Sequence, residues 1–128
     1  MRRGLILLLG LGLFANGSWM LVLPESWYDL VPGVINTGPA NLHFIRDIGC
    51  AYLMAGGSLL WMCKSPRAWP AAFAGGMFLA LHALVHVWDT ISGREQLHQM
   101  MRDMPAVVLP AIAVLWLAWP GRRVWKEE

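Results

Sequence analysis

The sequence predicts an all-α integral membrane protein, a bundle of four transmembrane helices with both termini on the cytoplasmic side. Of the 128 residues, 57% are hydrophobic and only 14% are charged, and mean hydropathy is +0.49, a balance that is not typical of soluble domains. Four segments also approach the roughly 20 apolar residues that a helix needs to cross the hydrocarbon core. They are residues 5–23, 42–62, 68–88 and 104–119, and we assign them to one membrane domain, 1–128.

The first segment, 5–23, follows Arg2 and Arg3 and shows no polar face in its first half. A secretory signal peptide begins in the same way, and the run Ala15-Asn16-Gly17 resembles a cleavage site. Apolar character resumes after this run, however, and brings the segment to spanning length. We therefore expect an uncleaved transmembrane helix.

The connections between the segments differ in length and composition. The stretch before the second segment is rich in proline and glycine, which predicts turns and a short interfacial helix around residues 25–31. The second and third segments are separated only by residues 64–67, so we expect a tight antiparallel hairpin. The hydrophilic loop 90–103 is expected to be solvated. In the fourth segment, Pro105 and Pro110 are expected to kink the helix.

Basic residues indicate the orientation of the bundle. With both termini inside, the cytoplasmic side holds Arg2, Arg3, Lys64, Arg67, Arg122, Arg123 and Lys126. The outer side holds Arg46, Arg94 and Arg102. This excess follows the positive-inside rule and predicts an N-in, C-in protein of a bacterial inner (cytoplasmic) membrane. The net charge of +2 is then explained by topology and gives no reason to expect a nucleic-acid partner.

Ionisable residues gather near one level of the second and third segments. They are His43, Arg46 and Asp47 in the second segment and His82, His86 and Asp89 in the third. In a straight hairpin centred near residue 65, residues at equal depth have numbers that sum to about 130, because both helices rise equally per residue. His43 is then level with His86, and Asp47 with His82, while Asn16 of the first segment lies at a similar depth. Such residues are costly inside a bilayer, so we take the group as a candidate functional site.

A metal site is the first interpretation of this group. His43, Asp47, His82 and His86 would supply three imidazoles and one carboxylate, a ligand set that suits zinc, copper or iron. The remaining residues, Arg46, Asp89 and Asn16, would orient the ligands without binding the metal themselves.

Two other interpretations remain open. Histidines that face each other on two helices can hold a haem b, here His43 with His82 or His86. Alternatively, the Arg46–Asp89 and Asp47–His82 pairs, together with Asn16, form a structural network of hydrogen bonds and ion pairs between the helices, with no chemistry.

The second segment also resembles a known family. Its run His43-Phe-Ile-Arg46-Asp47-Ile-Gly49, followed by Ala51-Tyr-Leu-Met-Ala-Gly56, is similar to an aromatic-Arg-x-x-Gly pattern with later small residues in DoxX-like small four-helix integral membrane proteins. The resemblance covers the whole chain in topology and one helix in motif. It implies a four-helix membrane fold and, for some members, a place beside quinone-linked redox enzymes.

Together these patterns predict a small membrane protein whose outer-leaflet polar cluster holds a transition metal (Cu, Zn or Fe) or a haem b in a redox-linked context. A non-catalytic accessory or assembly subunit of a larger membrane complex is the alternative, and a homo-oligomer is also open. A second alternative is a binding site for a quinone or a lipid headgroup that uses Arg46 and a histidine. No nucleophile–base pair, phosphate loop or nucleotide motif occurs, so no catalytic residue is predicted.

Overall fold

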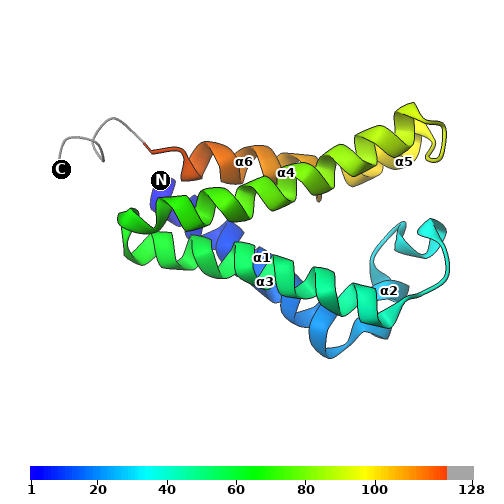
Figure 1. The fold of residues 1–128 in the computed structure, drawn as a ribbon, viewed down its shortest axis with the longest axis horizontal. Coiled ribbons are helices and arrows are strands. Elements are labelled where there is room, and N and C mark those ends of the chain that lie inside the picture. The colour runs from blue at the N-terminus through cyan, green and yellow to red at the C-terminus, as the bar shows by residue number, and fades with distance from the viewer. Residues whose placement is uncertain (121–128) are drawn as a thin grey trace.

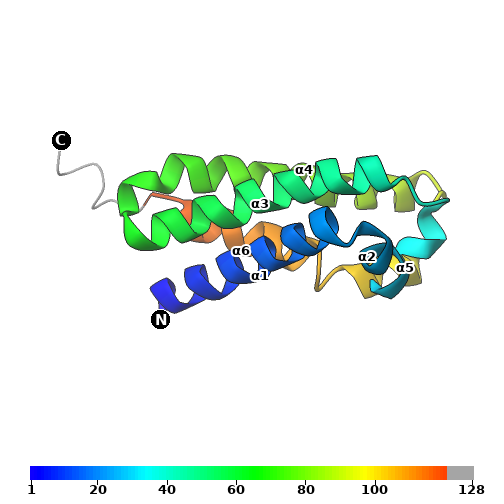
Figure 2. The ribbon, with the colours of Figure 1, turned by 90° about the horizontal axis from the view of Figure 1, so that it is seen from below.

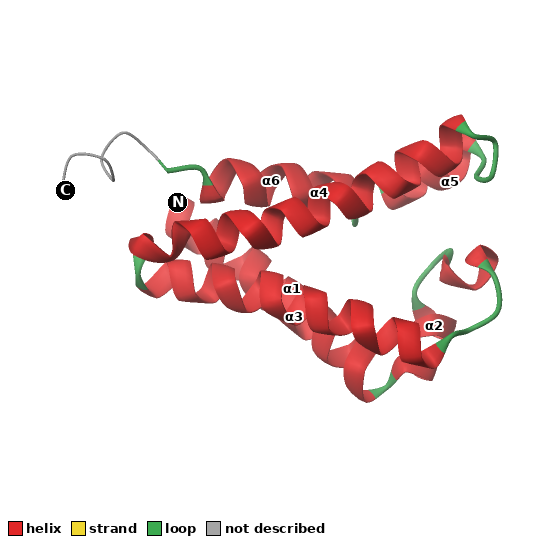
Figure 3. Ribbon diagram, in the orientation of Figure 1, coloured by secondary structure: helices red, strands yellow, loops and turns green. Residues whose placement is uncertain are grey.

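The structure, a computed structural model, describes residues 1–120. Every regular element in this part of the chain is helical, as the sequence predicts (Figures 1 and 3). In chain order the elements are α1 (Arg2–Val22), α2 (Pro24–Leu30), the 3-10 helix η1 (Val34–Thr37), α3 (Leu42–Lys64), the 3-10 helix η2 (Pro66–Ala68), α4 (Trp69–Ile91), α5 (Leu97–Asp103) and α6 (Val108–Ala118). Helix α2 confirms the short helix predicted around 25–31. Arg122, Arg123 and Lys126, which contribute to the predicted orientation, lie outside the described residues.

The long helices are arranged in two layers (Figures 1 and 2). Helix α1 packs beside α3 in one layer, α4 packs beside α6 in the other, and the α3–α4 hairpin joins the two. The hairpin turn consists of Ser65 and η2, which confirms the tight connection predicted from the sequence. Near this turn the layers lie close together, and they separate toward α2 and α5 (Figure 1).

Helices α1 and α3 approach each other closely because glycines lie where they meet. A Cβ atom on Gly17 would come within 2.7 Å of the Gly49 carbonyl oxygen, and one on Gly56 within 2.5 Å of the Phe14 amide nitrogen. Helix association in lipid depends on van der Waals contact, and small residues bring backbones close enough for it. Helix α3 therefore turns its glycine face toward α1.

The end of the molecule near the hairpin turn is tightly packed. A Cβ atom on Gly75 of α4 would lie 2.8 Å from the Cα atom of Ala55 on α3. Leu59, Val114 and Leu117, contributed by α3 and α6, are at most 1% exposed and fill the space between the layers at this end. Within residues 1–120 no polar or charged residue is fully buried. The apolar core thus holds the layers together at one end.

Two helical segments, Arg2–Val22 and Pro66–Ile91, are long and apolar enough to cross a membrane. The α5–α6 pair, bent by 45°, is a third if it is counted as one broken span. The break contains Pro105, which fits the kink expected there, because proline cannot donate a helical hydrogen bond. Helix α6 alone has 11 residues, a length of about 17 Å, which is short of a hydrocarbon core of about 30 Å. Helix α3 is long enough, but three charged residues lower its hydropathy.

Arg2 joins the first helix to the end of the last one. Its guanidinium donates hydrogen bonds to the carbonyl oxygens of Leu117 (2.7 Å) and Trp119 (3.1 Å), where α6 ends. The last carbonyls of a helix lack partners within the helix, and a cation is favoured beside them.

We expect Arg2→Met to lower the free energy of unfolding by about 1.5 kcal/mol or more, because a charged donor to these carbonyls is lost. Arg3→Met is the matched control, since Arg3 is exposed and its side chain makes no hydrogen bond to residues 1–120. Unfolding in detergent, followed by circular dichroism, measures both variants. Equal stability of the two variants would contradict the role given to Arg2.

Candidate functional site

A cavity of about 930 Å³ lies between the two helix layers, where they separate. Helices α1, α2 and α3 and the η1 segment line one side, and α4, α5 and α6 line the other. Most of the lining is apolar, with side chains such as Leu13, Ile48 and Val107. Small-molecule sites in proteins have volumes of about 300–1,000 Å³ and are apolar, with a few polar groups placed among the apolar ones. This cavity has those properties.

A small set of polar side chains interrupts the apolar wall. They are Asn16 on α1, Trp27 and Tyr28 on α2, Thr37 at the end of η1, Asn41 at the N-cap of α3, Tyr52 on α3, His82 and His86 on α4, and Arg102 and Asp103 on α5. Several of them are already engaged with each other or with the backbone. The Trp27 indole donates to the Asn16 side-chain oxygen at 3.0 Å, and the Tyr28 hydroxyl donates to the Gly38 carbonyl at 2.7 Å. These bonds fix α2 and the following loop over the cavity.

His82 and Tyr52 are different because their polar atoms have no such partners. The His82 ring stacks on Phe78, with centroids 6.2 Å apart, and meets Tyr52 edge-on at 6.1 Å. Neither the imidazole nitrogens of His82 nor the hydroxyl of Tyr52 form a hydrogen bond with another of the described residues. Ring packing therefore holds both side chains in place and leaves their donors and acceptors available to a ligand.

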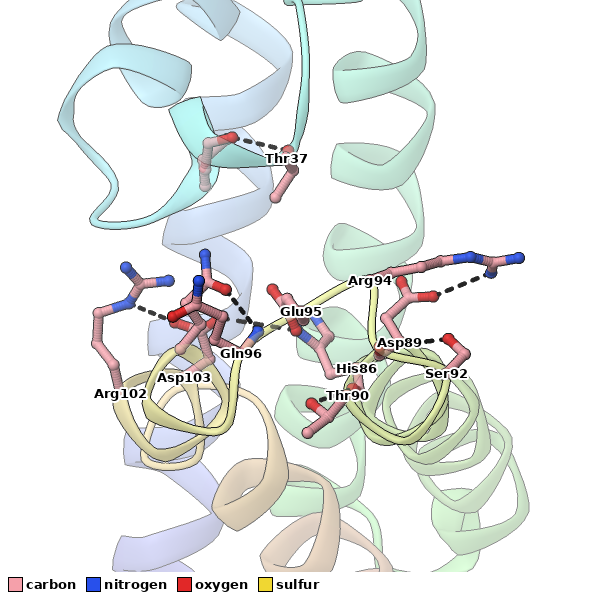
Figure 4. Close-up of polar contacts among 12 residues, drawn as sticks. Thr37, His86, Asp89, Thr90, Ser92, Arg94, Glu95, Gln96, Arg102 and Asp103 are labelled. Atoms are coloured by element: carbon pink, nitrogen blue, oxygen red, sulfur yellow. Dashed lines mark hydrogen bonds and ion pairs between the residues drawn. The ribbon is translucent and has the colours of Figure 1, made fainter.

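A second polar group lies at the mouth of the cavity, near the C-terminal end of α4 (Figure 4). The His86 Nδ1 atom is 3.7 Å from a Glu95 carboxylate oxygen and 3.8 Å from Oδ2 of Asp103. All three side chains are largely buried, with exposed fractions of 21%, 14% and 16%. Arg102 donates to the other oxygen of Asp103, Oδ1, at 2.8 Å. Arg102 also lies against Gly33 of the opposite layer, and both residues line the cavity.

The structure does not bring the four predicted metal ligands together. His43 and Asp47 pair with each other, Nε2 to Oδ2 at 3.5 Å, and their side chains are 88% and 60% exposed. They do not line the cavity, whereas His82 and His86 do. The reason is that α3 turns its glycine face toward α1 and separates from α4 at this level, which leaves the His43 stripe on the outside. The same geometry removes His43 as a haem ligand opposite His82 or His86.

The predicted supporting residues also have other partners. Asp89 pairs with Arg94 at 3.2 Å, and Arg46 is exposed, with no ion pair to any described residue. Asn16 bonds Trp27 and, through its amide nitrogen, contacts the sulfur of Met20 at 3.6 Å. The Arg46–Asp89 and Asp47–His82 pairs of the structural-network interpretation are therefore not formed.

Sequence reasoning missed Tyr52, Glu95 and Asp103. The two carboxylates were expected in solvent, but the loop after α4 folds back toward His86. The turn contains Gly93 at a positive φ of 74°, and the amides of Arg94 and Glu95 both donate to the Asp89 carbonyl. Gln96 and Gln99 then form a capping box that starts α5. The Ser-Gly turn and this capping pattern were the available signals that the loop is ordered.

Comparison of the chain with family models, with curated proteins and with solved structures finds no match. The resemblance to DoxX-like proteins therefore stays a prediction.

Proposed function

We propose that this protein spans the cytoplasmic membrane four times and binds an amphipathic small molecule of the quinone class in the cavity between its helix layers. One observation carries the proposal. His82 and Tyr52 present polar atoms without hydrogen-bond partners among the described residues, on the wall of an otherwise apolar cavity. A few polar groups on the wall of an apolar cavity are what orients a bound small molecule, so a ligand that pairs with these two side chains is expected.

A quinone suits both parts of this cavity. Its ring carbonyls accept hydrogen bonds, and His82 and Tyr52 offer an N–H and an O–H to such an acceptor. Its alkyl tail suits the apolar wall that Leu8, Leu13 and Val107 form. A membrane lipid is also amphipathic, and the experiment below distinguishes its headgroup from a quinone. The place of some DoxX-like proteins beside quinone-linked redox enzymes is consistent with a quinone as the bound molecule.

Helix lengths and charges support the four-span part of the proposal. Helix α3 has 23 residues, about 35 Å, which is enough to cross the core. Its charged residues Arg46 and Asp47 lie within its first turns, near the interface, where long polar side chains reach water. The broken α5–α6 pair supplies the fourth crossing. Arg2 contacts Trp119, so the two ends of the described chain share one side, and the basic residues there favour the cytoplasm.

His82→Phe tests the site because it keeps a ring against Phe78 and removes only the nitrogens. We expect this variant, and separately Tyr52→Phe, to weaken binding of a decyl-substituted benzoquinone to the purified protein about tenfold, the effect of one lost hydrogen bond of about 1.4 kcal/mol. His43→Phe is the matched control, since His43 lies outside the cavity and is expected to leave binding unchanged. Isothermal titration calorimetry measures the wild type and all three variants.

The outcomes of this experiment separate the alternatives. Absence of saturable quinone binding, or an equal loss in His43→Phe, would contradict the proposal. Displacement of the quinone by phosphatidylglycerol, with the same sensitivity to His82→Phe, would assign the cavity to a lipid headgroup instead.

A further inference from the structure

We propose that His86, Glu95 and Asp103 bind one divalent transition-metal ion at the mouth of the cavity. The three residues come from the end of α4, from the loop that follows it and from the last residue of α5. One ligand atom from each lies within 4.8 Å of the other two, and the side chains point toward one another in Figure 4. This site does not depend on the quinone proposal, because it uses neither His82 nor Tyr52.

Glu95 provides the observation that favours a cation here. Its Oε2 atom is buried and has no hydrogen-bond partner, and it is the only such side-chain atom among the described residues. The His86 Nδ1 atom, 3.7 Å away, is too far for a hydrogen bond, the Asp103 carboxylate within 4.8 Å repels it, and the Nε atom of Arg102 is bonded to Asp103. A buried anionic oxygen without a partner is costly, and a bound metal ion removes this cost.

The spacing of the ligand atoms is close to that of a metal centre. Bonds of about 2.0–2.1 Å to nitrogen and oxygen place two ligands of a tetrahedral ion about 3.4 Å apart. The two distances from His86 Nδ1 are 3.7 and 3.8 Å, so a contraction of a few tenths of an ångström would bring each carboxylate to the required distance from the imidazole. The two carboxylate oxygens lie within 4.8 Å of each other and are drawn together by a bound ion. Arg102 holds Oδ1 of Asp103 and thereby leaves Oδ2 directed at His86, as residues that orient a metal ligand do.

The donor atoms indicate the class of metal. One imidazole and two carboxylates, without a thiolate, suit zinc, iron(II) or manganese(II) better than copper(I). Three protein ligands also leave at least one coordination position for water or another small ligand. Of the four metal ligands predicted from the sequence, only His86 belongs to this site. Its other two ligands are the carboxylates of Glu95 and Asp103.

Zinc titration tests the site on the full chain. After treatment with EDTA, the purified protein in detergent is expected to bind one Zn²⁺ per chain in isothermal titration calorimetry, and its melting temperature is expected to rise. Loss of a group that merely orients a ligand usually weakens binding about 10–100-fold, so Glu95→Gln and Asp103→Asn, which each remove a ligand, are expected to weaken it about 100-fold or more.

Asp89→Asn is the matched control, because Asp89 is a carboxylate on the same helix as His86 but pairs with Arg94 instead of the three ligands. It is expected to keep one tight zinc site. Circular dichroism of the metal-free proteins shows whether each variant is folded. Two separate ligand variants are used so that the test still stands if one of them fails to fold. Zinc binding that is absent from the wild type, or retained by both folded ligand variants, would overturn the proposal. Protonated His86 would then form a simple ion pair with the carboxylates.

Discussion

Replacing Gly56 by alanine is expected to lower the free energy of unfolding by about 2 kcal/mol, although alanine is the better helix former. The added Cβ would lie 2.5 Å from the Phe14 amide nitrogen and 2.8 Å from the Gly10 carbonyl oxygen. Both are backbone atoms of α1, so no side-chain rotation relieves the overlap and the helices must move apart. In lipid, this separation removes the contact on which their association depends.

The adjacent residue supplies the control. A Cβ atom on Gly57 would have no neighbour within 4 Å, so Gly57→Ala is expected to leave stability unchanged or to raise it by up to about 1 kcal/mol. Unfolding of both variants in mixed detergent and dodecyl sulfate micelles, followed by circular dichroism, gives the difference. Equal destabilisation by the two substitutions would contradict the close packing of α1 on α3.

The second large effect is expected at Gly33. This residue has a φ of +92°, which costs an alanine about 1–2 kcal/mol, and an added Cβ would overlap the guanidinium of Arg102. Arg102 would have to leave its place at the mouth of the cavity. We therefore expect Gly33→Ala to destabilise the protein by about 2 kcal/mol, most of it backbone strain, with a smaller part from the displaced end of the flexible Arg102 side chain.

Gly93→Ala separates the two contributions. Gly93 also has a positive φ, +74°, but a Cβ atom added there would have no neighbour within 4 Å, so only the backbone strain of about 1–2 kcal/mol is expected. The difference between the two variants in the same unfolding assay measures the Arg102 contact. If Gly93→Ala costs as much as Gly33→Ala, Arg102 does not restrain the opposite layer.

The sequence was sufficient to predict elements that depend on local pattern. Apolar runs predicted the long helices, and proline with glycine predicted the turns around α2. The short connection 64–67 predicted the antiparallel hairpin, because so few residues allow no other path. The broken fourth segment followed from Pro105, whose ring and missing N–H interrupt a helix.

The candidate site was predicted only in part, because it depends on how the helices face each other. Equal depth on α3 and α4 follows from residue numbers only when the two axes stay parallel and adjacent. They separate instead, because Gly49 and Gly56 of α3 pack against α1, and His43 is left on the outside. His82 and His86 remain on the cavity because α4 faces the opposite layer there. Glu95 and Asp103 depend on the path of a loop, which periodicity does not specify.

The pairing of a packed end with a separated end has a mechanical consequence. The contact of Gly75 with Ala55 and the core around Leu59 act as a fulcrum, so a change in the angle between the layers produces little displacement there. The displacement that this rotation produces grows with distance along the helices, and it is largest at the separated end, where Arg102 contacts Gly33. We therefore expect the proposed quinone to enter and leave at this separated end, where the contact between Arg102 and Gly33 has to open.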